Sequence, residues 1–158
     1  MKKYFFIVAM MALALILSYH NLAAQAYTLA PDFKLEDLDK NIFTLSSCKD
    51  KNPVILFFWA TWCPYCRKEL KILNEMNAEL KKEGIEVLAI DVNEPFSRVD
   101  NFVKNNQLNF KVFLDSKAAA AEDYGLIGLP TYILVDKKGY IRFIGFSFPK
   151  EKYKELIK

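Results

Sequence analysis

The stretch Trp59-Ala60-Thr61-Trp62-Cys63-Pro64-Tyr65-Cys66 places two cysteines, separated by two residues, directly after an apolar run. That run, residues 54–58, predicts a buried strand, and apolar residues at helical spacing after Cys66 predict a long helix. A helix start has unpaired backbone N–H groups and a partial positive charge, which favour a thiolate over a thiol. The thiolate attacks disulfides, and a cysteine three residues further on can close a small ring and release the partner. The stretch therefore predicts a redox-active pair of cysteines.

The first residues carry the features of a secretory signal. Two lysines precede an uncharged apolar run at residues 5–17, and polar residues follow it. Small residues then allow cleavage after Ala24 or after Ala26. The apolar run is short for a membrane-spanning helix, which needs about 18 residues or more. We therefore predict a signal peptide over residues 1–24, with a retained membrane anchor as the alternative, and one mature domain over residues 27–158. The mature protein is expected to be periplasmic or otherwise extracytoplasmic.

Composition excludes several classes of function. The chain has 158 residues, of which 53% are hydrophobic and 26% charged, enough for one ordinary domain. Without the two lysines of the signal, the net charge falls from +3 to +1, so we expect no nucleic-acid surface. The single histidine, His20, lies before the mature domain, which then has no imidazole for a Ser–His or Cys–His catalytic pair. Three cysteines alone are too few for a structural zinc site, and we expect neither a metal nor another cofactor.

Strands and helices alternate along the mature domain, and a hairpin closes it. Strands are expected at residues 33–35, 42–45, 54–59, 85–90, 110–114, 131–135 and 140–146. Helices are expected from residue 66 to Gly84 and at residues 97–105, 118–124 and 149–157. Ser97 and Asp100 resemble a capping box at the start of the second helix. This order predicts an α/β fold of three layers with a mixed central sheet.

These features resemble the TlpA/ResA-like branch of the thioredoxin superfamily, which contains exported thiol–disulfide oxidoreductases. The resemblance runs from about Ala30 to the C-terminus. It rests on Ala30-Pro31-Asp32-Phe33, on the block at residues 59–66 and on Gly128-Leu129-Pro130-Thr131. It also includes the segment 92–114, which is longer than a minimal thioredoxin carries. The resemblance implies a thioredoxin-like fold, in which helices flank a central mixed β-sheet, with an N-terminal β-hairpin and a helical insertion.

The resemblance also assigns roles by position. It makes Cys63 the exposed attacking thiolate and Cys66 the buried resolving thiol, which together form the Cys63–Cys66 disulfide. Pro130 matches the family's cis-proline, which lies against the disulfide and shapes the substrate groove. Glu69 matches an acidic residue thought to tune the protonation of the cysteines, although a glutamate in a first helical turn also simply favours the helix dipole. The carboxylate that thioredoxin carries six residues before the first cysteine is replaced here by Phe57. Further substrate contacts are expected at Trp62, Pro64, Tyr65, Leu129 and Thr131.

The function that this resemblance implies is reduction of disulfides in specific extracytoplasmic proteins, and family members often serve cytochrome c maturation. The expected partners are protein disulfides or dithiols and a membrane thiol electron donor, because an oxidising compartment cannot itself restore the dithiol. The membrane is a partner of the chain itself only if the N-terminal segment is retained.

Several alternatives remain open at this point. The same cysteines suit an oxidase or isomerase, although Tyr65 lacks the positive charge with which a histidine would stabilise a thiolate. A peroxiredoxin-like peroxidase shares the start at residues 30–33, but Ala60 stands where that family carries Thr or Ser. The pair could also be an inert structural disulfide, or the domain a binding module without turnover. We interpret Cys48, which lies in a polar stretch, as an incidental free thiol.

Overall fold

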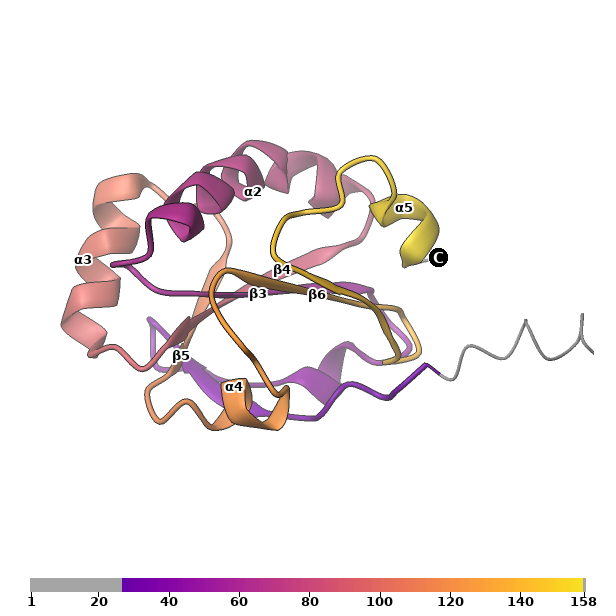
Figure 1. The fold of residues 1–158 in the computed structure, drawn as a ribbon, viewed down its shortest axis with the longest axis horizontal. Coiled ribbons are helices and arrows are strands. Elements are labelled where there is room, and N and C mark those ends of the chain that lie inside the picture. Colours follow the sequence, from indigo (N-terminus) through magenta and orange to yellow (C-terminus); the bar gives the residue numbers. More distant parts are fainter. Residues whose placement is uncertain (1–26, 158) are drawn as a thin grey trace, which may run out of the picture.

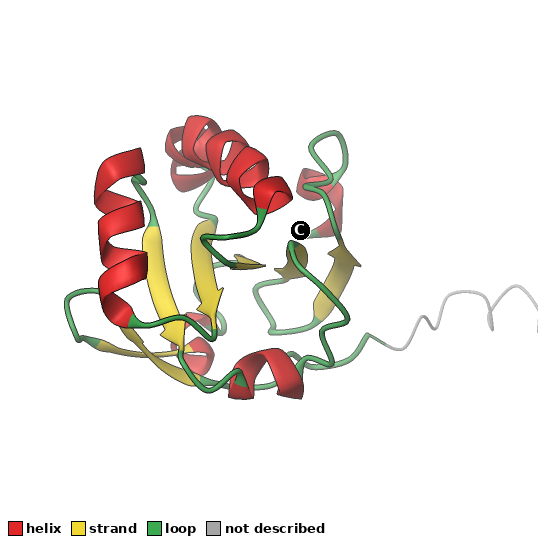
Figure 2. Cartoon of the chain, turned by 60° about the vertical axis from the view of Figure 1, so that its left-hand side comes forward, coloured by secondary structure: helices red, strands yellow, loops and turns green. Residues whose placement is uncertain are grey.

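The computed structural model describes residues 27–157. The signal peptide or anchor expected over residues 1–24, and both candidate cleavage positions, lie outside this range. Within it, no helix combines the length and the apolar character needed to cross a membrane. Figure 1 shows a central sheet with helices on both sides, and Figure 2 shows the long helix α2 lying across it.

Seven strands form one mixed sheet in the described part of the chain, in the order β2-β1-β5-β4-β3-β6-β7. Strands β3, β4 and β5 are parallel, and the remaining neighbours are antiparallel. The strands are β1 (Lys34–Asp37), β2 (Ile42–Thr44), β3 (Val54–Trp59), β4 (Glu86–Val92), β5 (Lys111–Asp115), β6 (Thr131–Val135) and β7 (Ile141–Gly145). The helices are α2 (Pro64–Lys82), α3 (Phe96–Asn106), α4 (Ala119–Asp123) and α5 (Tyr153–Leu156), with a short 3-10 helix η1 (Leu45–Cys48). The predicted α/β fold, its mixed sheet and its N-terminal hairpin are confirmed.

The central strand β3 is buried on both faces, which explains its continuous apolar sequence. Its side chains at 55, 57 and 59 join the core under α2, α3 and α5, whereas those at 54, 56 and 58 join the core on the α4 side. Figure 1 shows α2 and α5 above the sheet and α4 below it. Only residues 60–63 separate β3 from α2, and both cysteines belong to the core under α2, α3 and α5.

Two helix starts differ from the prediction. Helix α3 begins at Phe96 rather than at a Ser97 capping box, and no side chain caps it. The carbonyl of Pro95 accepts the N–H of Arg98 at 3.0 Å and closes the first turn instead. The last helix is confined to Tyr153–Leu156, because the residues from Pro149 onward first form turns. The backbone N–H of Lys152 donates to the carbonyl of Pro149 at 2.9 Å in one of these turns.

Cys48 is a free thiol, and its side chain is buried although its neighbours Ser46, Ser47, Lys49 and Asp50 are exposed. It ends the 3-10 helix η1, retains 5% of its surface and packs in the core on the α4 side. Burial raises the pKa of the Cys48 thiol, and the charge of Glu86 adds to the effect. The thiol is free but little ionised, so it is poorly suited to attack a disulfide.

Candidate active site

Cys63 and Cys66 form a disulfide at the start of α2, with their Cα atoms 5.2 Å apart. Cys63 is the N-cap residue of the helix, and its Sγ accepts the backbone N–H of Cys66 at 3.1 Å. Pro64 occupies the first helical position, where its missing N–H leaves nothing unpaired. The sulfur of Cys63 therefore sits at the positive end of the helix, where a thiolate is stabilised.

The two cysteines differ slightly in their exposure to solvent. Cys63 retains 4% of its surface and Cys66 none, so the expectation of an exposed Cys63 holds only relative to Cys66. The aromatic residues beside them are open: Trp62 is 62% and Tyr65 70% exposed. Pro64, between the cysteines, is also exposed. Two large apolar side chains thus flank the small accessible part of the disulfide, where a partner protein could bury them.

The peptide bond between Leu129 and Pro130 is cis and directly precedes β6. Thr131 pairs with Phe58 across the β3–β6 ladder, which brings Pro130 to the end of β3 from which the cysteine loop leaves. Pro130 is buried, and Leu129 is half-buried. The hydroxyl of Thr131 donates to the carbonyl of Gly128 at 2.7 Å, so this side chain holds its own loop rather than facing a substrate.

Glu69 lies on α2 one turn after Cys66 and is half-buried rather than solvated. Its Oε2 accepts the hydroxyl of Tyr132 at 2.9 Å and the backbone N–H of Phe148 at 3.4 Å. Burial, followed by the charge of Glu69 and this hydrogen bond, raises the pKa of Tyr132 well above its usual range. The Glu69 carboxylate therefore connects α2 to β6 and to the C-terminal segment.

A second acidic residue, in the loop between β4 and α3, holds the approach to Cys63. Glu94 is only 4% exposed and accepts the backbone N–H of Thr61 at 2.5 Å and its hydroxyl at 2.7 Å. On the other side, Nε of Arg67 donates to the Thr61 carbonyl at 2.9 Å. The polar groups of Thr61 are thus all engaged, and the turn leading into the cysteine pair is fixed from both sides.

The pKa of Glu94 reflects these contacts. Burial alone raises it, but hydrogen bonds from Thr61, Asp91 and Arg98 outweigh burial and leave the pKa below its usual value. Arg98 contributes an ion pair from α3, with Nη1 at 3.4 Å from Oε1. Glu94 is therefore a buried carboxylate that stays ionised because its oxygens are occupied.

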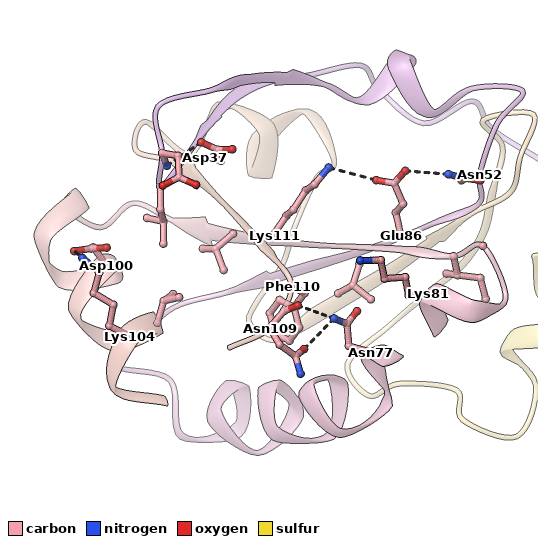
Figure 3. Close-up of a pocket in the computed structure, with 17 residues that line it drawn as sticks. Asp37, Asn52, Asn77, Lys81, Glu86, Asp100, Lys104, Asn109, Phe110 and Lys111 are labelled. Atoms are coloured by element: carbon pink, nitrogen blue, oxygen red, sulfur yellow. Dashed lines mark hydrogen bonds and ion pairs between the residues drawn. The ribbon is translucent and has the colours of Figure 1, made fainter. Parts of the chain in front are cut away.

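A separate hollow of about 670 Å³ lies where β4 and β5 begin, at the far end of these strands from Thr61 and Glu94. Figure 3 shows that its polar side chains engage one another. Glu86 accepts from Nδ2 of Asn52 at 3.0 Å and pairs with Lys111 at 3.8 Å, while Asn77 donates to Asn109. We therefore do not assign the reaction to this hollow. Among the described residues, no cluster of His, Cys, Asp and Glu is arranged to hold a metal ion.

Residues 27–144 match the AhpC/TSA family. The chain belongs to this family. The ResA thiol-disulfide oxidoreductase of Bacillus thuringiensis subsp. konkukian is 39% identical over 130 residues, which cover 82% of this chain and 75% of that protein. The ResA protein of Geobacillus thermodenitrificans is 36% identical over 129 residues, 81% of this chain and 74% of its own.

Solved structures agree with these relatives. A Chlorobium tepidum structure assigned to the thiol:disulfide interchange protein DsbE has a TM-score of 0.73 and 29% identity, covering 82% of this chain and 91% of that one. StoA from Bacillus subtilis has a TM-score of 0.68 and 25% identity, and the match covers 81% of this chain and 97% of the StoA chain. The ResA-like resemblance is confirmed, and the protein is a thiol–disulfide oxidoreductase of thioredoxin-like fold.

Proposed function

We propose that this AhpC/TSA family member is exported and reduces disulfides in specific extracytoplasmic proteins, with Cys63 as the attacking and Cys66 as the resolving residue. The observation that carries the proposal is the position of the Cys63 sulfur. It caps the start of α2 and belongs to the less buried of the two cysteines, which lies between exposed Trp62 and exposed Tyr65 in the chain. The helix start favours the thiolate, and the aromatic pair offers a surface for a protein substrate.

The reaction follows from the two sulfurs. In the reduced enzyme the Cys63 thiolate attacks one sulfur of the substrate disulfide, whose S–S bond breaks and releases a thiolate that takes up a proton. Cys66, after losing its proton, attacks the Cys63 sulfur, and the second substrate sulfur leaves and is protonated in turn. Two electrons pass to the substrate and the Cys63–Cys66 disulfide forms. A membrane-bound dithiol donor then returns two electrons and two protons to the enzyme.

The substrate class that we propose is a cysteine pair of the haem-attachment type, whose thiols must be reduced before haem is bound. This part rests on the family resemblance at residues 59–66 and 128–131. The relatives named ResA support thiol–disulfide exchange in general. Leu129, Pro130 and Thr131 would then form the wall of the substrate groove through their backbone, since two of the three side chains are buried.

One observation favours an oxidase as the second candidate. Nζ of Lys68 lies 5.6 Å from the ring centroid of Tyr65. Lys68 therefore brings a positive charge towards the cysteine pair, whereas the two residues between the cysteines carry none. A positive charge lowers a thiol pKa and makes the disulfide form more oxidising. Lys68 is exposed, so salt screens this charge, and we favour the reductase. A peroxidase is disfavoured, because Ala60 supplies no hydroxyl three residues before Cys63.

The reduction potential of the Cys63–Cys66 couple decides the direction of electron flow. For a reductase we expect a value near that of thioredoxin, about −270 mV, measured in glutathione and dithiothreitol buffers. A value near about −120 mV would identify a disulfide donor and overturn the reductase proposal. Repeating the measurement with Lys68→Gln tests the charge over Tyr65: a more negative potential in this variant is expected if that charge stabilises the thiolate.

Substitution of Glu69 tests its proposed role in proton handling. Glu69→Gln keeps an oxygen that can accept the Tyr132 hydroxyl but removes the negative charge next to the resolving cysteine. We expect the thiol pKa of the reduced enzyme to fall by about one unit, because a nearby negative charge disfavours the thiolate. The measurement is the pH dependence of alkylation by iodoacetamide.

Tyr132→Phe is the matched control for this experiment, since it removes the hydrogen bond that Glu69→Gln can keep and leaves in place the charge that Glu69→Gln removes. We expect no downward shift of the thiol pKa in this variant. If Glu69→Gln titrates like the unmodified enzyme, Glu69 only connects α2 to β6 and has no part in proton handling.

A further inference from the structure

Asp91 is a buried carboxyl group that the reaction described above does not use. It is the sixth of the seven residues of β4 and is only 1% exposed. Its partner on β3 is Trp59, which lies four residues before Cys63. Within residues 27–157, neither of its carboxyl oxygens has an N–H or hydroxyl partner. The group that it meets is the carboxylate of Glu94.

Two buried carboxylates in contact repel each other unless one keeps a proton. Glu94 has reason to be the ionised member, because it accepts both polar hydrogens of Thr61 and pairs with Arg98. Asp91 has no such partners, so a shared proton is expected on Asp91, whose O–H would donate to Glu94. The hydrogen bond thus extends the chain of contacts from β4 through Glu94 to Thr61, two residues before Cys63.

We propose that Asp91 is a positioning residue for thiol–disulfide exchange: its protonated carboxyl holds Glu94 in the orientation that fixes Thr61 and the turn entering the cysteine pair. Loss of this proton would place a second negative charge beside Glu94 and break the hydrogen bond between them. The turn would loosen, and the added negative charge would disfavour the Cys63 thiolate. This inference needs the exchange activity but not the direction of electron flow, so it stands apart from the proposed reductase function.

The charged groups around Asp91 set the pH at which Asp91 loses its proton. Glu94 follows β4, Arg98 faces it from α3 and Asp115 from the end of β5, while its β3 neighbour Trp59 does not titrate. Burial, the hydrogen bond to Glu94 and the charge of Glu94 raise the pKa of Asp91 to about 8, against a smaller opposing effect of Arg98. The folded protein therefore holds a proton that the unfolded chain releases near pH 4, and the stability from this proton falls as the pH rises towards 8.

Asp91→Asn tests the proposal, because an asparagine amide donates to Glu94 at every pH and cannot titrate. We expect the exchange rate of the unmodified enzyme, divided by that of D91N, to fall roughly threefold from about pH 6 to about pH 10, because only the unmodified enzyme loses the hydrogen bond to Glu94 that holds the turn before Cys63. Taking the ratio removes the rise in rate that both enzymes share. Asp100→Asn is the matched control: it removes one carboxylate on α3 that pairs with Lys104, and its rate ratio should stay constant.

A second measurement needs no variant. The Thr61 amide resonance of the oxidised protein should titrate with a midpoint near pH 8, since this N–H donates to the Glu94 carboxylate. A rate ratio that stays flat across the range, or a Thr61 resonance that does not move between pH 6 and pH 10, would overturn the proposal. If D91N does not fold, the Thr61 titration alone decides.

Discussion

Replacing Cys63 by serine is expected to abolish disulfide exchange, with insulin reduction in the presence of dithiothreitol falling to the rate without enzyme. The reason is chemical: a serine hydroxyl at this helix start is not ionised at neutral pH and forms no disulfide. The fold should survive, because the substitution changes one atom at a position that caps α2, and serine is a good N-cap residue. Far-ultraviolet circular dichroism of C63S should therefore match that of the unmodified protein.

The companion variant Cys66→Ser separates attack from resolution. Cys63 remains free to attack, but nothing displaces the substrate, so a mixed disulfide should accumulate and be visible on a non-reducing gel. With a peptide that carries an oxidised haem-attachment cysteine pair, the trapped species would also identify the proposed substrate class. The matched control is Cys48→Ala, which removes the third thiol from the core and should leave exchange intact. Exchange that persists in C63S, or that is lost in C48A, would contradict the assignment of the attacking sulfur.

The fold was largely predictable because its main signals are local. An uninterrupted apolar run at β3 indicates a strand covered on both faces, and the adjacent CxxC pair with a proline indicates a helix start. Alternation of strands and helices then predicted the mixed sheet. The ends of the elements were less predictable, as at Ser97 and Pro149, because backbone carbonyls close the turns there instead of the side chains that the sequence offered.

The site could be predicted from the sequence only where its reactive residues lie in one short segment, as the two cysteines do. Glu94 and Asp91 lie far from the cysteines in the sequence, and the contact of Glu94 with Thr61 exists because β3 and β4 are parallel neighbours that end at the same edge of the sheet. A usable signal was present, because acidic residues lie at and just after the end of the strand next to the one that carries the cysteine motif. The burial of Cys48 had no such signal, since it is set by packing in the core on the α4 side, and Thr131 is buried where β6 pairs with β3.

Phe57→Ala is expected to be the most destabilising core substitution that bears on the site. Phe57 is fully buried in the centre of β3, and its ring lies 4.5 Å from that of Tyr132. Removing a buried phenylalanine side chain costs about 3–5 kcal/mol, through lost transfer free energy and the cavity that remains. Small domains have about 5–15 kcal/mol of stability in total, so urea unfolding of F57A should begin at much lower denaturant.

The effect should reach the active site, because the cavity opens beneath the residue that holds Glu69. Tyr132 lies between Phe57 and Phe148, whose ring is 5.6 Å away, and its hydroxyl donates to Glu69. With one ring removed, Tyr132 can shift and weaken that hydrogen bond. Phe96→Ala is the matched control: this side chain is 41% exposed at the start of α3, and its truncation should cost about 1 kcal/mol or less. Equal losses of unfolding free energy in the two variants would contradict this prediction. They would mean that the core under α2, α3 and α5 does not depend on the Phe57 side chain.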